Sequence, residues 1–355
     1  MTDPPDPRAN PSTPLLAVED LTVHFPITKG VVARRRIGTV RAVDGVTLAV
    51  GEHETLGLVG ESGSGKTTLG RAIVGLYRPT SGSIRFRGRE LTDDVRERER
   101  GQLQMVFQDP VASLDPRWTI ARSVDEPLRL SGIRDRAERR RRVTELLEVV
   151  GLPARFARRY PHELSGGQRQ RVGVARALAL RPALVVADEA VSALDVSVRA
   201  QILNLLERLQ REFGLAYVFI AHDLGVVEHI SDRVAVMYLG RIVELAPTDA
   251  LFTDPLHPYT VSLLSAIPVP DPRVEAARER IVLKGDPPNP ADPPSGCRFH
   301  TRCWLRERLD DPIVCRTDDP PLRQLGDGHV AACHFAEQLR GSPEQDQAAS
   351  AGTTS

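Results

Sequence analysis

Residues 60–67 have the composition and spacing of a phosphate-binding loop: they read Gly-Glu-Ser-Gly-Ser-Gly-Lys-Thr and follow the apolar run 56–59. Glycines at these positions let backbone N–H groups close around phosphate oxygens, and a helix that begins here points the positive end of its dipole at them. Lys66 can reach the β- and γ-phosphates of a nucleotide, and the Thr67 hydroxyl can coordinate Mg²⁺. The complete pattern therefore predicts a nucleotide site rather than a chance turn. The expected nucleotide contacts are Gly60, Glu61, Ser62, Gly63, Ser64, Gly65, Lys66, Thr67 and Thr68.

Two adjacent carboxylates follow another apolar run. Residues 184–187 read Leu-Val-Val-Ala and are followed by Asp188 and Glu189. A buried strand here would hold Asp188 beside a metal ion and Glu189 beside an attacking water. Alone this is a weak signal, since many parallel strands end in an acidic residue for capping reasons. Together with the phosphate loop it predicts hydrolysis of a nucleotide.

Two further polar residues follow predicted strands. His222 comes after the run 215–220, at the edge of a parallel sheet where ligands bind, and can hydrogen-bond the γ-phosphate or the water. Gln108 comes after the run 105–107 and can contact Mg²⁺ or water. An ordinary polar residue at a strand end is the alternative explanation for each.

A second glycine-rich segment, Leu-Ser-Gly-Gly-Gln at residues 164–168, precedes a helical stretch at 169–180. A serine and two glycines at a helix start form another anion-binding N-terminus. One chain has little use for two such sites on one nucleotide. We therefore expect this segment to face the γ-phosphate held by a partner chain, so that ATP is sandwiched between two chains and its binding closes the pair.

The elements that position these residues follow from the apolar pattern. Short apolar runs alternate with amphipathic stretches, which predicts a largely parallel sheet covered by helices. Leu69, Ile73 and Leu76 mark one face of a helix after the phosphate loop. The runs 234–238 and 242–245 predict a late hairpin.

Three regions depart from that alternation. Residues 110–161 lack strand-like runs and carry many charges, so we expect a helical insertion. Proline density rises sharply after residue 254, which predicts a separate, loop-rich C-terminal module at 259–340. The polar segments 1–14 and 341–355 are predicted to be disordered tails.

Charge and hydropathy exclude some classes of protein. Lys+Arg and Asp+Glu both number 47, and such balance argues against coating of nucleic acid, so we expect no nucleic-acid partner. No apolar run reaches the roughly 18 residues that a membrane-spanning helix needs. Residues 1–14 have no signal-peptide pattern. We expect a cytoplasmic chain that meets a membrane through its partners.

In combination, the motifs resemble the ATPase subunits of ABC transporters over about residues 15–258. The resemblance implies an α/β fold: a P-loop NTPase (RecA-like) core with an ABC helical subdomain and an antiparallel β part, plus a small cysteine-containing C-terminal module. It also implies that Phe25, on an early strand, stacks on adenine. The implied catalytic residues are Glu189 (the base), His222, Lys66 and Gln108. The implied Mg²⁺ ligands are Thr67, Gln108 and Asp188, and the further nucleotide contacts are Ser165, Gly166, Gly167, Gln168 and Asp195.

Two residues differ from the family's usual pattern. Ala190 follows Glu189 where proline is usual, and Ala221 precedes His222 where serine or threonine is frequent. Neither change removes a catalytic group, so we expect an active ATPase.

Several segments are similar to the ATPases of oligopeptide/dipeptide importers: residues 107–116, 160–163, 237–244 and 255–260. The insertion containing Arg34-Arg35-Arg36 resembles the second of the two ATPases that such importers often carry. This resemblance implies ATP-driven import of peptides at the cytoplasmic face of the inner membrane. The implied partners are two membrane permease subunits, a second ABC ATPase (a paralogue or a second copy) and, indirectly, an external substrate-binding protein. Import of another small solute, such as a metal chelate, is the main alternative. A non-transport ABC ATPase and a redox-regulatory module are less favoured.

All four cysteines lie in the C-terminal module, at Cys297, Cys303, Cys315 and Cys333. No two of them form a close C-x-x-C pair, which suits a zinc ribbon poorly, whereas an iron–sulfur cluster tolerates irregular spacing. The resemblance to importers implies a [4Fe–4S] cluster here. Four reduced structural thiols without metal, and less favourably zinc, are the alternatives.

Overall fold

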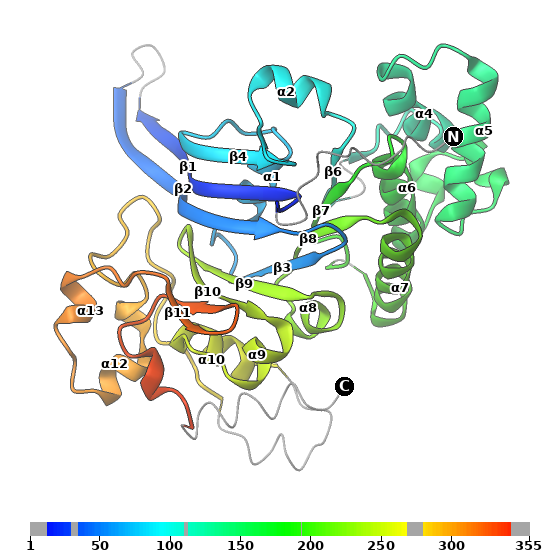
Figure 1. The fold of residues 1–355 in the computed structure, drawn as a ribbon. Coiled ribbons are helices and arrows are strands. Elements are labelled where there is room, and N and C mark those ends of the chain that lie inside the picture. Colours follow the sequence, from blue (N-terminus) through cyan, green and yellow to red (C-terminus); the bar gives the residue numbers. More distant parts are fainter. Residues whose placement is uncertain (1–12, 30–34, 110–112, 193, 268–279, 342–355) are drawn as a thin grey trace.

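The computed structural model describes residues 13–29, 35–109, 113–192, 194–267 and 280–341. The predicted tails therefore lie almost wholly outside the described residues, as does Arg34 of the basic triplet. The described chain forms two sheets with helices around them (Figure 1). None of its helices is long and apolar enough to cross a membrane.

The smaller sheet is antiparallel and has the strand order β2-β1-β4-β5. Its strands are β1 (Leu16–Lys29), β2 (Arg35–Val50), β4 (Ser81–Phe86) and β5 (Arg89–Glu90). Residues 26–29 and 35–41 belong to the paired strands β1 and β2, in which Phe25 lies opposite Val40. The described residues of the insertion therefore extend this strand pair.

The larger sheet has eight strands in the order β11-β12-β10-β9-β3-β8-β7-β6. The five strands β9, β3, β8, β7 and β6 are parallel to one another, with β6 at the edge of the sheet. Strands buried on both faces read as continuous apolar runs, which is why the sequence indicated them. Their bounds are β3 (Thr55–Val59), β6 (Leu103–Val106), β7 (Leu184–Asp188), β8 (Ala216–Ile220) and β9 (Arg233–Tyr238). The predicted late hairpin is confirmed, since β9 pairs antiparallel with β10 (Arg241–Pro247).

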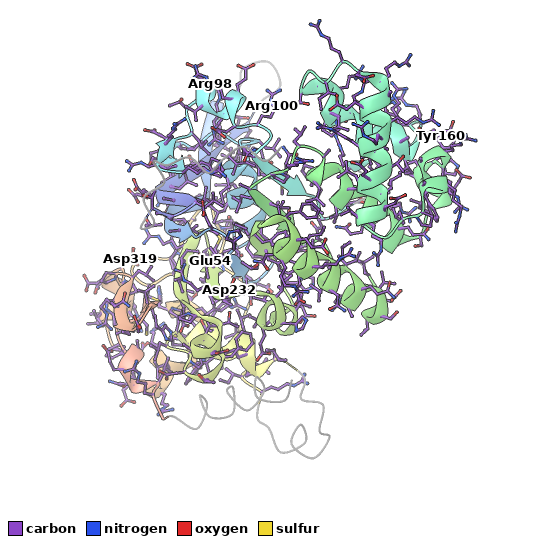
Figure 2. The ribbon with its side chains drawn as sticks, turned by 45° about the vertical axis from the view of Figure 1, so that its right-hand side comes forward. Glu54, Arg98, Arg100, Tyr160, Asp232 and Asp319 are labelled. Atoms are coloured by element: carbon purple, nitrogen blue, oxygen red, sulfur yellow. The ribbon has the colours of Figure 1, made fainter. Side chains whose placement is uncertain are left out.

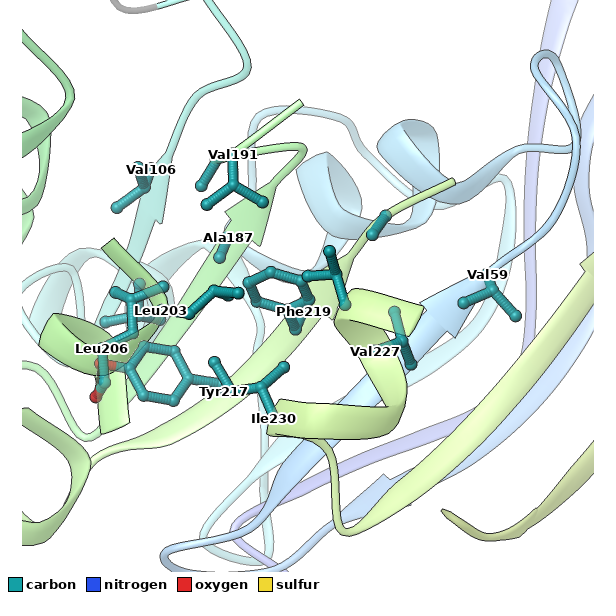
Figure 3. Packing of buried hydrophobic residues seen from close by; sticks show 14 of the residues in the cluster. Val59, Val106, Ala187, Val191, Leu203, Leu206, Tyr217, Phe219, Val227 and Ile230 are labelled. Carbon is teal, nitrogen blue, oxygen red and sulfur yellow. Dashed lines mark hydrogen bonds between the residues drawn. The ribbon is translucent and has the colours of Figure 1, made fainter. Parts of the chain in front are cut away.

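Alternate residues of the parallel strands enter two apolar cores. Val186 and Val218 face the helix α1 (Lys66–Ile73) and the smaller sheet. Tyr217 and Phe219 point to the opposite face, where they pack among residues of β7 and α7 (Val196–Phe213) (Figure 3). The sheet is therefore covered on both faces.

The helix α1 is shorter than the sequence predicts. It ends at Ile73, so Leu76 lies beyond it and is 56% exposed. Gly75 has a φ of 84°, a left-handed conformation that a continuing helix cannot use. The prediction that Leu76 packs on the same face is therefore wrong.

Between residues 113 and 163 the described chain forms helices and no strand. These helices are α4 (Ile120–Leu130), α5 (Arg136–Val149) and the short 3₁₀ turns η1 (Ala154–Arg158) and η2 (Pro161–Glu163). The helix α6 (Gly166–Leu178) follows and packs against α4, α5 and α7. In Figure 2, Tyr160 of this helical region and Asp319 of the C-terminal module lie on opposite sides of the molecule.

The C-terminal module shares the larger sheet instead of forming a separate unit. Its strand β12 pairs with β10, with Glu244 opposite Ala331. The pairing covers the edge of β10, which would otherwise leave backbone groups open. The prediction of a separate appendage is wrong in this respect.

The remaining elements are α2 (Asp93–Arg98), α8 (Leu224–Ile230), α9 (Thr248–Thr253), α10 (Pro258–Ser265), η3 (His300–Arg302), α12 (Trp304–Arg308), α13 (Val314–Thr317), β11 (Arg323–Gly326), β12 (His329–Ala331) and η4 (Ala336–Gln338).

Candidate nucleotide site

The phosphate loop connects β3 to α1 and depends on two of its glycines. Gly60 and Gly65 have φ values of 147° and 110°, which L side chains rarely adopt. A Cβ atom on Gly60 would lie 2.1 Å from the carbonyl oxygen of Met237, and one on Gly65 would lie 2.1 Å from that of Ala42. The loop is thus pressed between β9 and β2, so both positions require glycine.

Lys66 is folded into the phosphate loop. Its ammonium donates to the carbonyl oxygens of Gly60 at 2.7 Å and Glu61 at 2.9 Å, and its residue is only 5% exposed. Burial lowers the pKa of Lys66, although the nearby Glu189 and Asp188 act in the opposite direction. A phosphate in the loop would replace these carbonyl partners with full negative charge.

Two of the predicted Mg²⁺ ligands are in direct contact. The Thr67 hydroxyl donates to a carboxylate oxygen of Asp188 at 2.9 Å. Burial raises the pKa of Asp188, against the opposing hydrogen bond from Thr67. A hydroxyl and a carboxylate are the hard oxygen donors that Mg²⁺ prefers, so this pair fits the ion. Gln108, the third predicted ligand, is bonded elsewhere.

Two other predicted catalytic residues, Gln108 and His222, lie next to Glu189. The amide of Gln108 donates to one of its carboxylate oxygens at 2.6 Å, and Nδ1 of His222 lies 3.6 Å from the other. These residues come from the ends of β6, β7 and β8, because the carboxyl ends of parallel strands share one edge. Glu189 itself has a φ of 45°, a strained conformation typical of functional sites. A cavity of about 10 Å³, the size of one water molecule, is lined by Glu189 and His222.

The second glycine-rich segment forms the start of α6 and is not hydrogen-bonded to the phosphate loop in the described residues. The Ser165 hydroxyl accepts from the Gln168 amide at 3.3 Å, and the Gln168 side chain accepts from the Ser165 amide at 3.0 Å. Ser165 is exposed. Gly167 is required by packing, since a Cβ there would lie 2.3 Å from Val198 of α7. Asp195 caps α7 by accepting from the Val198 amide at 3.0 Å.

Phe25 is partly buried beside the same region. Its ring packs edge-to-face on Tyr77, with 5.2 Å between the ring centroids. Phe25 is paired with Val40 of β2, close to Ala42, whose carbonyl oxygen lies against Gly65. The strand segment that carries Phe25 is therefore close to the end of the phosphate loop, where α1 begins.

Two arginines of the C-terminal module contact the phosphate loop and the strands beside it, which the sequence did not predict. Arg302 donates to both carboxylate oxygens of Glu61, at 2.8 and 3.1 Å. Arg298 bonds to Asp44 of β2 and to the carbonyl oxygen of Leu239. Nothing in the spacing indicates these pairs, since Arg302 and Glu61 are 241 residues apart. The only signal in the sequence was the occurrence of these two arginines beside the cysteines.

The four cysteines line one small cavity and all of them are free thiols. Burial raises the pKa of Cys297 to about 11 and that of Cys303 to about 12, and it also raises the pKa values of Cys315 and Cys333. No group of three or more His, Cys, Asp or Glu residues with metal-binding geometry occurs in the part of the chain that the structure describes.

The phosphate loop, the Thr67–Asp188 pair that fits Mg²⁺ and the Glu189 carboxylate beside a small cavity are typical of a P-loop ATPase. Comparison with protein families narrows the class. Residues 43–192 match the family described as ABC transporter, and residues 243–308 match the oligopeptide/dipeptide transporter C-terminal region. The chain belongs to the family of ATP-binding subunits of ABC transporters, as the motifs predicted, and it is an ATPase that uses ATP with Mg²⁺.

Curated relatives span nearly the whole chain. The oligopeptide transport ATP-binding protein AppF of Bacillus subtilis (strain 168) is 51% identical over 331 residues, covering 92% of this chain and 98% of the relative. The probable peptide ABC transporter ATP-binding protein y4tS of Sinorhizobium fredii is 53% identical over 327 residues, covering 91% and 90%.

Solved structures support the fold. The ATP-binding cassette MJ0796, solved as a dimer bound to ADP and Pi, is 31% identical and has a TM-score of 0.58, covering 66% of this chain and 98% of its own. The cbiO1 protein of Clostridium perfringens is 25% identical with a TM-score of 0.60, covering 74% and 98%. The predicted α/β P-loop NTPase fold is confirmed.

Proposed function

We propose that this chain hydrolyses ATP to power the import of peptides through a membrane permease. The observation that carries the proposal is the convergence of Glu189, Gln108 and His222 beside the phosphate loop, in a chain that ends in an oligopeptide/dipeptide transporter C-terminal region. The residues of the nucleotide site account for ATP hydrolysis, and the C-terminal region supports peptides as the transported solute.

The residues divide the chemistry among them. Lys66 leaves the Gly60 and Glu61 carbonyls and neutralises the β- and γ-phosphates. Thr67 and Asp188 hold Mg²⁺, which when bound withdraws charge from the phosphate oxygens. Glu189 orients and polarises the attacking water. Gln108 donates to one oxygen of that carboxylate, which leaves the other oxygen of Glu189 to act on the water.

The remaining nucleotide contacts come from a second ATPase subunit, either a paralogue or another copy of this chain. The start of α6, with Ser165, Gly166, Gly167 and Gln168, of which Ser165 is exposed, is suited to hold the γ-phosphate of the partner's nucleotide. Asp195 lies at the N-terminus of the neighbouring helix α7. We assign Phe25 to the adenine. The dimeric form of the related cassette MJ0796 supports this arrangement.

The permease would dock in a groove between the core and the helical region. A cavity of about 680 Å³ lies here, lined from the core by Tyr77 and Phe107 and from the helical region by Glu126, Leu130 and Arg176. Leu130 is 71% exposed. Each of the two permease subunits would present one helix at the cytoplasmic face of the inner membrane to one ATPase subunit. That helix would place an apolar side chain in this groove. An external substrate-binding protein would act through the permease.

The four thiols would hold a [4Fe–4S] cluster. The four thiols line one cavity, which supports a shared ligand, and their raised pKa values mean that the cluster must displace four protons on binding. We expect anaerobically purified protein to contain iron and acid-labile sulfide, and Cys303→Ser to lose both. Zinc in place of iron, or four freely titratable thiols without metal, would contradict this assignment.

Transport tests the function directly. The chain, the partner ATPase and the permease subunits encoded beside it would be reconstituted in vesicles. The ATPases and ATP would be enclosed in the lumen, and the binding protein and the solutes would be added outside. We expect uptake of labelled di- to pentapeptides only with ATP. Uptake of a metal chelate but no peptide would identify the alternative cargo, and failure to co-purify with any permease would refute the transport function.

A further inference from the structure

Glu61, the second residue of the phosphate loop, is held from the C-terminal module at two points. The guanidinium of Arg302 grips its carboxylate with two hydrogen bonds, at 2.8 and 3.1 Å. The Tyr259 hydroxyl accepts a hydrogen bond from its backbone amide at 2.8 Å. The side chain of Arg302 is only 7% exposed, so water cannot readily replace Glu61 as its partner, and loss of this ion pair would leave a buried charge unpaired. We call Glu61, Tyr259 and Arg302 the loop brace.

The loop brace stands on a rigid base. Tyr238, Tyr259 and Phe299 are fully buried and pack on one another, with ring centroids 4.7 to 5.4 Å apart. They join the end of β9 to α10 and to the segment that carries Arg302. Since β9 also supplies the Met237 carbonyl that faces Gly60, one packed cluster sets both the position of the loop and that of its brace.

A phosphate loop needs such support for two physical reasons. Its glycines at positions 60, 63 and 65 have positive φ values, and glycine-rich backbone loses much conformational freedom when it is ordered around a ligand. Ordering the loop in advance removes that cost from binding. In addition, the Glu61 carboxylate would repel a triphosphate, and Arg302 neutralises it at close range.

We propose that Arg302 is a positioning residue for ATP: through Glu61 it holds the phosphate loop in its binding form, so that the C-terminal module sets the nucleotide affinity of the motor. Arg302 does not need to touch the nucleotide. The inference rests on the proposed nucleotide site. It assigns a role in nucleotide binding to the C-terminal module, which contains none of the nucleotide motifs.

Nucleotide affinity and loop mobility test the inference with the full-length chain. Binding of a fluorescent ATP analogue would be measured by titration, and backbone hydrogen exchange at residues 60–66 without nucleotide. For Arg302→Gln we expect about tenfold weaker binding, which is about 1.4 kcal/mol, together with faster exchange in the loop. In the assembled transporter KM for ATP should rise while kcat at saturating ATP changes by less than about twofold.

Two controls separate this role from general weakening of the fold. Arg323 makes a comparable two-point contact with Glu337 in the same module, at 2.9 and 3.2 Å and away from the phosphate loop. We expect Arg323→Gln to bind ATP as the unmodified chain does. In a Glu61→Gln background the carboxylate is gone, so adding Arg302→Gln should cost less than about threefold. If Arg302→Gln does not fold, Arg302→Lys keeps the charge but loses the two-point grip, and about threefold weaker binding is expected.

Three results would overturn the inference: unchanged affinity and exchange in Arg302→Gln, an equal loss in Arg323→Gln, or an equal cost of Arg302→Gln with and without the Glu61 carboxylate. If the unmodified chain itself bound no ATP, the nucleotide site would fail instead. The two failures are therefore distinguishable.

Discussion

At the scale of single residues, the proposed catalytic groups are engaged in hydrogen bonds within the chain. The Gln108 amide donates to the Glu189 carboxylate at 2.6 Å, and the Lys66 ammonium donates to a carbonyl oxygen of the phosphate loop. In the proposed mechanism, Lys66 exchanges its carbonyl partners for phosphate oxygens when the nucleotide enters. Nucleotide binding would thus be coupled to a local conformational step.

The assignment of Glu189 as the base makes a clear prediction. Glu189→Gln keeps the shape and the bond to Gln108 but cannot accept a proton, so ATP hydrolysis should fall by at least about 100-fold. ATP binding should persist, and a closed dimer should accumulate. Phosphate release and size-exclusion chromatography with ATP measure the two effects. Hydrolysis close to that of the unmodified chain would remove Glu189 as the base.

Lys66 can be tested against a second lysine. Lys66→Ala removes the main positive contact of the γ-phosphate, so we expect ATP turnover to disappear. Lys284 lies in an exposed pair with Glu307 and serves as the control, because Lys284→Ala should leave turnover unchanged. Turnover in Lys66→Ala, measured by phosphate release, would contradict the site.

At the scale of elements, the contact between α6 and α7 positions the second glycine-rich segment at the start of α6. Gly167 allows this approach, since any Cβ would lie 2.3 Å from Val198. Gly173, farther along α6, faces open space, because a Cβ there would meet no neighbouring atom within 4 Å. The two glycines therefore differ in environment although they share one helix.

Substitution by alanine should separate these two positions. Gly167→Ala overpacks the contact, so we expect the free energy of unfolding to fall by about 1–3 kcal/mol and the start of α6 to shift. Gly173→Ala should be neutral or add up to about 1 kcal/mol, since alanine favours helix. Urea denaturation of both variants measures the difference. Equal effects would show that close packing is not what Gly167 provides.

At the scale of the whole molecule, one buried carboxylate joins the core to the C-terminal module. Glu244 of β10 is fully buried and accepts from the amides of Leu256 at 2.6 Å and His257 at 3.0 Å. It also pairs with His329 of β12 at 2.8 Å. Three separate segments of the chain therefore meet at this one carboxylate.

Removal of that carboxylate should loosen the module. Glu244→Ala leaves two buried amides and a buried histidine without their partner, so we expect a loss of about 3–5 kcal/mol in the free energy of unfolding. Limited proteolysis should then cut the C-terminal module first. Glu337→Ala, which breaks an exposed pair with Arg323, should change stability by less than about 0.5 kcal/mol. A stable, protease-resistant Glu244→Ala variant would contradict this account.

The nucleotide motifs could be predicted from the sequence because their chemistry is local. The phosphate loop is one contiguous segment whose glycines and lysine act through their own backbone and side chains. The buried parallel strands were equally visible, since each is a continuous apolar run. Once those strands are parallel, Asp188, Glu189, Gln108 and His222 must meet at one edge, so even their convergence followed from the order of elements.

Only the tertiary structure decided how the C-terminal module joins that site. The contacts of Arg302 with Glu61 and of His329 with Glu244 link residues far apart in the chain, and neither spacing nor composition encodes such a pair. The same holds for the pairing of β12 with β10. These features depend on which surfaces meet after the strands have assembled, and packing rather than local preference makes that choice.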